Sequence, residues 1–240
     1  MNRAVPIVLI VATAAAGGFF AERALNGRKS ITPATEPATV RADAPGQVSE
    51  EQNRPAPTVP ETLPDVTLPD RAGTPRSLVS WKGRPLIINF WATWCGPCRE
   101  EIPLLNTLRK ERAADRLEVI GIAVDERQAV LKFAREMGID YPVLMGEQEG
   151  YEAAEHFGVA SLVLPFSVFA DSQGRIVTLK VGELHPDQAA AILDRVRDVD
   201  ANRLSLADAR RQIADKLRDL SADLSRDHDE DEGSPRSPGG

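Results

Sequence analysis

Apolar residues in the middle of the chain follow two patterns, unbroken runs and helical stripes. The runs at 86–90 and 117–124 are mostly apolar, which is typical of strands buried on both faces of a sheet. Stripes with apolar residues three or four positions apart alternate with such runs and predict helices. By residue number, we expect strands at 86–90, 117–124, 141–145, 166–170 and 176–181, and helices at 98–112, 126–137, 151–157 and 187–198. The alternation predicts an α/β fold in which helices flank a mixed central sheet, with a hairpin at Asp171-Ser172-Gln173-Gly174.

Residues 1–25 differ from the rest because 4–21 are apolar without an internal charge. A bilayer-spanning helix needs about 20 apolar residues, so this run is just long enough for a signal anchor. Small-residue sites such as Ala12-Thr13-Ala14 also fit a signal peptide that is cleaved. Positive charge marks the cytoplasmic side of a span, and Arg3 is outnumbered by the basic residues at 23–29. The sequence predicts a membrane segment, while this charge count by itself argues against export.

The remaining chain divides by composition into four segments. Residues 26–61 are rich in Pro, Ala, Thr and Glu and predict a flexible tether, although a leader without a spacer role fits as well. The folded domain is expected at 62–199, followed by a helical segment at 200–225. Residues 226–240 are charged and rich in Gly and Pro, and we expect them to be disordered.

The segment at 200–225 contains a predicted helix at 205–225 with one narrow apolar stripe. The stripe consists of Leu206, Ile213, Leu217, Leu220 and Leu224. Two interpretations remain open: a helix docked on the domain, and a dimerisation or partner helix. Three heptads are the minimum for a coiled coil, which favours the docked helix.

Charge and cysteine content narrow the classes of function. The net charge of -7 argues against a nucleic-acid binder, because phosphate contacts need a basic face. The chain has two cysteines, both in one motif, so no cysteine is left for a structural disulfide framework.

That motif, Trp94-Cys95-Gly96-Pro97-Cys98, directly follows a predicted buried strand and opens a predicted helix. A helix N-terminus favours a thiolate, so Cys95 is the candidate nucleophile. Cys98, one turn later, is placed to resolve a mixed disulfide, and the spacing lets the two sulfurs bond. Pro97 suits the first helical turn. A zinc half-site would need two further ligands; the three histidines, His156, His185 and His228, are scattered, so we expect no metal.

The segment 86–99 resembles the active-site segment of the thioredoxin superfamily. Residues 63–199 are similar to its TlpA/ResA-type branch, the membrane-anchored disulfide reductases and cytochrome c maturation thioredoxins of exported type. In that branch a glutamate follows the redox pair on the same helix, and Glu101 takes that place. The resemblance implies that Glu101 exchanges the proton of Cys98; the alternative is a surface carboxylate favoured by the helix N-terminus. Thioredoxins proper carry an aspartate where this chain has Asn89, which cannot accept a proton, and this difference favours the exported branch.

The superfamily also has a cis-proline that faces the cysteines, and Pro165 matches it. Backbone groups of Leu164 would then pair with an extended substrate, whereas a trans proline at a strand start would not offer them in this way. With Trp94, Gly96 and Pro97, these two residues form the implied substrate-binding set. The approach at 159–164 is longer than the family's usual one, so substrate choice does not carry over.

The resemblance implies a thiol–disulfide oxidoreductase without a cofactor. We expect it to reduce disulfides of exported proteins, of the apocytochrome c or copper-site assembly kind, with electrons from a membrane thiol donor. It would work on the periplasmic side of the bacterial inner membrane, anchored by residues 4–21 or released after cleavage. The alternatives are a disulfide-donating oxidase of the same fold, and a metallochaperone or binding module, for which the usual Cys-x-x-x-Cys is absent. The Thr-x-x-Cys signature of peroxidases is also absent.

Overall fold

The computed structural model describes residues 58–159 and 161–232, with side chains to 222. The predicted membrane segment at 4–21 and nearly all of the predicted tether lie outside these residues. Within them, no helix is long and apolar enough to cross a membrane.

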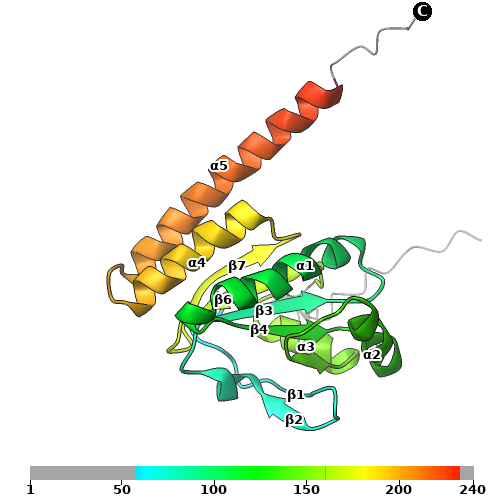
Figure 1. Cartoon of the computed structure of the whole chain (residues 1–240). Coiled ribbons are helices and arrows are strands. Elements are labelled where there is room, and N and C mark those ends of the chain that lie inside the picture. Colours follow the sequence, from blue (N-terminus) through cyan, green and yellow to red (C-terminus); the bar gives the residue numbers. More distant parts are fainter. Residues whose placement is uncertain (1–57, 160, 233–240) are drawn as a thin grey trace, which may run out of the picture. The chain divides into compact units, whose positions relative to one another are not determined.

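A five-stranded mixed sheet lies at the centre of the described residues, in the order β5-β4-β3-β6-β7 (Figure 1). The two inner strands with continuous apolar sequence, β3 and β4, are buried at every position. The strands are β3 (Leu86–Trp91), β4 (Glu118–Ala123), β5 (Val143–Met145), β6 (Phe166–Ala170) and β7 (Ile176–Val181). The predicted mixed sheet flanked by helices, and thus the thioredoxin-like α/β class, is confirmed.

Two hydrophobic clusters cover opposite faces of this sheet. Ile87 and Trp91 of β3 belong to the cluster with α1, α2, α4 and α5, whereas Ile88 and Phe90 belong to the cluster with α3, β1 and η2. This split follows from the alternation of side chains along a strand. The helices are α1 (Gly96–Glu111), α2 (Arg127–Glu136), α3 (Gln148–His156), α4 (Pro186–Asp200) and α5 (Leu206–Glu232), with 3-10 turns η2 (Leu78–Trp81) and η3 (Ala113–Asp115).

The register of the sheet brings two distant loops to one end of β3. β3 pairs in parallel with β4 and antiparallel with β6, where Phe90 lies opposite Phe166. The loop that leaves β3 at Trp91 therefore lies at the same end as Pro165, which enters β6.

Several predicted boundaries differ from the observed ones. α1 begins at Gly96 rather than 98, because Cys95 acts as its N-cap and proline is tolerated in the first turn. α3 begins at Gln148 rather than 151, and β5 begins at Val143, after Pro142, which has no N–H for the ladder. A small hairpin of β1 (Thr67–Pro69) and β2 (Pro75–Ser77) was not predicted, since three-residue strands are too short to show a pattern.

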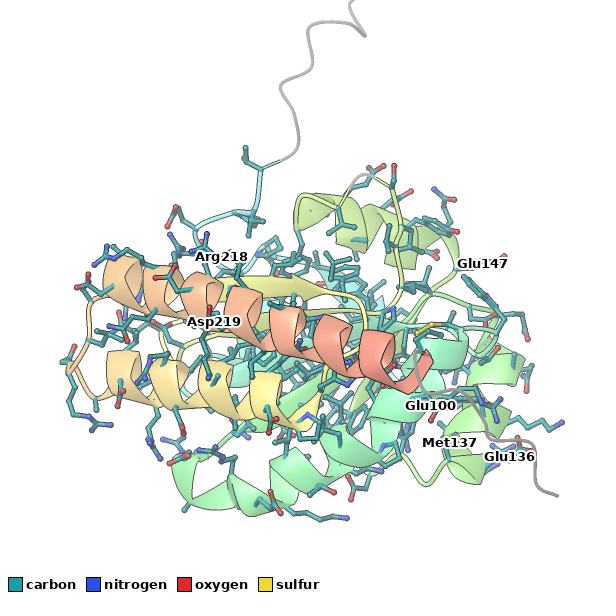
Figure 2. All side chains as sticks on the ribbon, turned by 90° about the horizontal axis from the view of Figure 1, so that it is seen from above. Glu100, Glu136, Met137, Glu147, Arg218 and Asp219 are labelled. Carbon is teal, nitrogen blue, oxygen red and sulfur yellow. A yellow bond between two sulfur atoms is a disulfide. The ribbon has the colours of Figure 1, made fainter. Side chains whose placement is uncertain are left out.

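The C-terminal helix is longer than predicted and rests on the domain. α5 packs against α4 and β7, and Figure 2 shows it alongside α4. Ala209 and Ile213 are buried in the same core cluster as α4, which supports the docked interpretation for this part of α5. The helix continues to Glu232, so residues 226–232, expected to be disordered, are helical. The first glycine or proline after Leu206 is Gly233, which explains why the helix does not end at 225.

Candidate active site

The Cys95–Cys98 pair lies where β3 passes into α1. The loop before it is tied to the loop after β4, because the Thr93 N–H donates to Asp125 Oδ2 at 3.0 Å. Cys95 is the N-cap of α1, and its Sγ accepts the Cys98 N–H at 3.3 Å. The helix thus directs a backbone donor at the sulfur that the sequence marks as the nucleophile, an arrangement that favours a thiolate.

The two cysteines form a disulfide with a Cα–Cα distance of 5.3 Å. Cys95 is 5% exposed and Cys98 is fully buried, so only the Cys95 end can be reached from solvent. Beside the pair, Trp94 is 67% exposed and Trp91 is buried. Gly96 and Pro97 are exposed, so the predicted substrate-binding residues Trp94, Gly96 and Pro97 form an accessible surface around a nearly closed disulfide.

Glu101 is buried one turn beyond Cys98 on the same helix. Residues three apart on a helix are neighbours, so its carboxyl group is on the cysteine side of α1. Burial raises the pKa of Glu101 to about 7, against hydrogen bonds from Leu184 and Asn89 that favour the carboxylate. The surface-carboxylate alternative is therefore wrong, since the side chain is only 1% exposed. A carboxyl group with this pKa holds or releases a proton near neutral pH, as proton exchange with a thiol requires.

Asn89 connects Glu101 to the centre of the sheet. Its Nδ2 donates to Glu101 Oε1 at 2.6 Å and to Ser167 Oγ at 3.1 Å. Its Oδ1 is buried, and no described residue donates to it. An amide carries both donors and an acceptor, so after rotation Asn89 could also accept a hydrogen bond from protonated Glu101. The side chain can therefore serve both protonation states of the acid.

A turn after β7 completes the surroundings of Glu101. The Leu184 N–H donates to Glu101 Oε2 at 2.9 Å. Lys180 Nζ holds the turn by donating to the carbonyl groups of Val181, Gly182 and Glu183 at 2.7, 3.3 and 3.0 Å. The Lys180 charge also lowers the pKa of Glu101, opposing the effects of burial and of Glu183.

The same turn contacts the proline that enters β6. Gly182, with a left-handed φ of 82°, donates its N–H to the Pro165 carbonyl at 2.8 Å. The Leu164–Pro165 peptide bond is cis; Leu164 is half-buried and Pro165 buried. The structure therefore brings Pro165 and Glu101 to one turn, 180–184, although they are far apart in sequence.

Sequence reasoning named the cysteines, Glu101, Asn89 and Pro165, and it missed Lys180, Leu184 and Ser167. A lysine late in a strand usually suggests a solvated position, and Leu184 acts through its backbone N–H, which carries no sequence signal. The roles assigned to Cys95, Cys98 and Glu101 in exchange, and to the substrate-binding set, stay predictions.

Comparison with known proteins shows the family of this chain and several proteins similar to it. The model of the AhpC/TSA family matches residues 59–179. A thiol-disulfide oxidoreductase ResA of Bacillus thuringiensis is 31% identical over 134 residues, which are 55% of this chain and 75% of that protein. The thioredoxin-like protein YneN of Bacillus subtilis is 33% identical over 138 residues, 56% of this chain and 78% of that protein. A solved structure of a secreted thiol-disulfide isomerase from Corynebacterium glutamicum has a TM-score of 0.52 at 27% identity, covering 57% of this chain and 85% of that one.

Proposed function

The chain belongs to the AhpC/TSA family and is a thiol–disulfide oxidoreductase of the ResA type, and on this basis we propose that it reduces disulfides in proteins outside the cytoplasm. The observation that carries the proposal is a disulfide in which Cys95, the only member with any exposure to solvent, caps a helix, while the fully buried Cys98 lies one turn from buried Glu101.

The proposed reaction has two exchange steps. The Cys95 thiolate attacks a substrate disulfide, forms a mixed disulfide and releases one substrate thiolate. Cys98 then gives its proton to the Glu101 carboxylate and attacks the Cys95 sulfur. The second substrate thiolate leaves, and the Cys95–Cys98 disulfide forms. Two electrons have passed from the cysteine pair to the substrate, and an external thiol donor must return them before the next cycle.

The direction of electron flow rests on the residues between the cysteines. Strong oxidants of this fold usually carry a histidine there that stabilises the thiolate, whereas this chain has Gly96-Pro97. Glu101, with a pKa of about 7, can take the proton of the resolving thiol in this direction and return it in the reverse one, so it serves the exchange without setting its direction.

The proposal also covers the location and the partners of the protein. The apolar run at 4–21 would hold the domain on the periplasmic side of the inner membrane, and a membrane thiol donor would supply electrons. A solved relative is described as secreted, which supports a place outside the cytoplasm. Clients would be exported proteins of the apocytochrome c or copper-site assembly kind, meeting the surface of Trp94, Gly96, Pro97, Leu164 and Pro165.

The test is covalent trapping in the full-length chain. Cys98→Ser leaves Cys95 able to attack but removes the resolving thiol, so mixed disulfides with exported proteins should accumulate. Cys95→Ser is the matched control and should trap no client. A Cys98→Ser chain that accumulates none would contradict the substrate class. A reduction potential of about -270 mV fits a reductase, and one of about -120 mV would identify an oxidase instead.

A further inference from the structure

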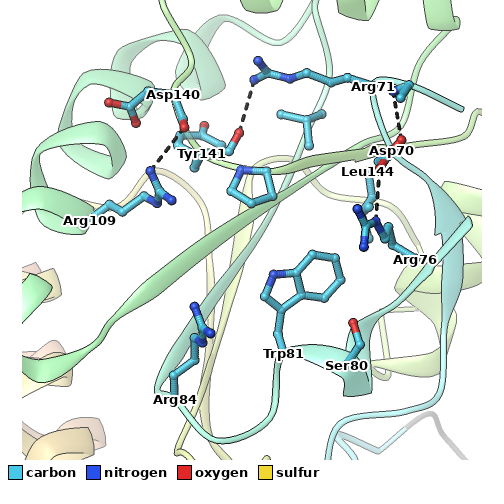
Figure 3. A pocket seen from close by; sticks show the side chains of 13 residues that line it. Asp70, Arg71, Arg76, Ser80, Trp81, Arg84, Arg109, Asp140, Tyr141 and Leu144 are labelled. Atoms are coloured by element: carbon cyan, nitrogen blue, oxygen red, sulfur yellow. Dashed lines mark hydrogen bonds and ion pairs between the residues drawn. The ribbon is translucent and has the colours of Figure 1, made fainter. Parts of the chain in front are cut away.

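A hollow with a volume of about 730 Å³ lies at the β5 edge of the sheet, apart from the cysteine site. Arg84, on its wall, precedes β3, whereas the disulfide follows the end of that strand. A six-residue strand separates the two places by about 20 Å. Figure 3 shows the labelled arginines arranged around the Trp81 ring. We name this site the arginine hollow; its principal residues are Arg71, Arg76, Trp81, Arg84, Arg109 and Asp140.

One guanidinium in the arginine hollow has no carboxylate partner. Arg71 Nη2 donates to the carbonyl groups of Ile139 and Tyr141 at 2.9 and 3.2 Å. Among the residues that the structure describes, no acidic group forms an ion pair with Arg71. Its carbonyl contacts fix the side chain in place, and the Asp140 carboxylate attracts its charge without forming an ion pair with it.

A second positive charge is left over beside Glu118. Arg109 Nε and Arg84 Nη1 lie 2.5 and 3.4 Å from the two oxygens of this one carboxylate. The acidic residues of the hollow balance these charges only in part, because Asp140 attracts both Arg71 and Arg109 while each acid also forms an ion pair. Asp70 pairs with Arg76 at 3.1 Å and Asp140 pairs with Lys110 at 2.8 Å. The arginine hollow and its ion-pair partners thus hold five basic and three acidic side chains, an excess of two positive charges in a protein whose net charge is -7.

Trp81 adds an apolar surface to these donors. The residue is half-buried and packs against the core at its back, and Pro142, Val143 and Leu144 line the same space. Guanidinium groups bind carboxylate and phosphate through paired N–H donors, and aromatic faces stack on planar groups. The volume is that of a small-molecule site.

We propose that the arginine hollow binds a small organic anion with at least two negative charges, carried by carboxylate or phosphate on a planar apolar body. The anionic groups meet Arg71 and Arg84, and the planar body lies on Trp81. This site is separate from the disulfide, so the proposal goes beyond the reductase function and does not depend on it.

The experiment titrates the full-length protein with trimesate, tricarballylate and phenyl phosphate. The chain has three tryptophans, and proton–nitrogen NMR resolves the indole N–H of each, with Trp81→Phe assigning one. We expect saturable shifts of the Trp81 signal and none of Trp91 or Trp94. Trimesate should bind more tightly than tricarballylate, its aliphatic counterpart with the same three carboxylates; tighter binding of phenyl phosphate would support the phosphate form of the ligand.

Arg84→Gln and Arg71→Gln should each weaken binding about tenfold, the effect of one charge-assisted hydrogen bond. Arg197→Gln is the matched control, since the Arg197 side chain is 46% exposed against 44% for Arg84 and pairs with Asp194 on α4. Exchange with a small disulfide, measured on every variant, shows that the fold and the cysteine site are intact. Equal affinities of Arg84→Gln and Arg197→Gln, or an unmoved Trp81 signal in the parent protein, would overturn the proposal while leaving the reductase function untouched.

Discussion

Asn89 Nδ2 donates to Glu101 Oε1 at 2.6 Å, and both side chains are buried beneath the cysteine pair. An acidic residue at position 89 would compete with Glu101 for a proton. The Asn89 amide instead forms a hydrogen bond with Glu101 in either state, as a donor to the carboxylate or, after rotation, as an acceptor from the protonated acid. In the mechanism that we propose, a single acid, Glu101, therefore exchanges the proton of Cys98.

Replacing Glu101 with Gln should slow the exchange step carried out by Cys98 by about a hundredfold at neutral pH, a common contribution of general base catalysis. Glu101 must be ionised to accept the proton, so the parent rate should rise with pH through about 7, and this rise should vanish in the variant. Single-turnover reduction of a model disulfide across pH provides the measurement. Glu100→Gln alters the neighbouring exposed acid (Figure 2) and should behave like the parent. Identical profiles for the parent and Glu101→Gln would remove Glu101 from the mechanism.

The raised pKa of Glu101 also makes stability depend on pH. The folded protein holds this proton up to about pH 7, whereas the unfolded chain releases it near the ordinary glutamate pKa of 4.5. The contribution of Glu101 to the free energy of unfolding should therefore be greatest below about pH 4.5. This contribution should fall by roughly 3 kcal/mol as the pH rises to about 7. Urea unfolding of the disulfide form at several pH values measures this slope. Glu101→Gln should lack it, and an equal slope in both proteins would refute the assignment.

Lys180→Met should raise the pKa of Glu101 further, because the lysine charge is one of the influences that lower it. The carboxyl carbon signal of Glu101 in NMR, followed against pH, gives the midpoint directly. Lys180→Arg retains the charge and should leave the midpoint nearer to that of the parent. Lys110→Met removes a surface charge paired with Asp140 and should leave it unchanged. A midpoint that moves down in Lys180→Met would show that the lysine acts only by holding the turn.

Ile213→Ala should destabilise the domain by about 3 kcal/mol, the usual cost of emptying a buried isoleucine site, since Ile213 is 2% exposed. Leu220→Ala, later on the same apolar stripe but half-exposed, should cost less than about 1 kcal/mol. Urea denaturation monitored by circular dichroism measures the loss of stability in both variants. Equal, small effects would mean that α5 does not dock on the domain in solution.

The inner strands and the redox motif could be predicted from sequence because each has a strong local signal. β3 and β4 are buried on both faces and therefore read as continuous apolar runs, and Cys-Gly-Pro-Cys sits at a strand-to-helix junction. The β1–β2 hairpin was missed because its strands are short and largely polar. Lys180 and Leu184 were missed for another reason: their contribution depends on where β7 turns relative to α1, and only the folded chain brings residues 101 and 184 together.

The arginine hollow could not be predicted from the sequence, because only folding brings its residues together. Arg71, Arg84 and Arg109 belong to a hairpin, a loop and a helix, and no spacing relates them. Trp81 ends the short η2 turn before the central strand, and one side of it packs against the core. Trp81 also lines the arginine hollow together with β5 residues, and only the folded chain brings these residues together.

The antiparallel register of β3 and β6 fixes the position of Pro165, so the loop at 159–164 can change in length without moving the cysteine site. Phe166 is fixed opposite Phe90, so Pro165 keeps its place at the end of the sheet whatever precedes it. Residues added or lost at 159–164 change the rim that a client would touch without shifting the cysteines, Glu101 or the turn that holds it. If clients meet this surface as we propose, a change in the length of one loop would alter which client is bound and leave the residues of the proposed exchange chemistry in place.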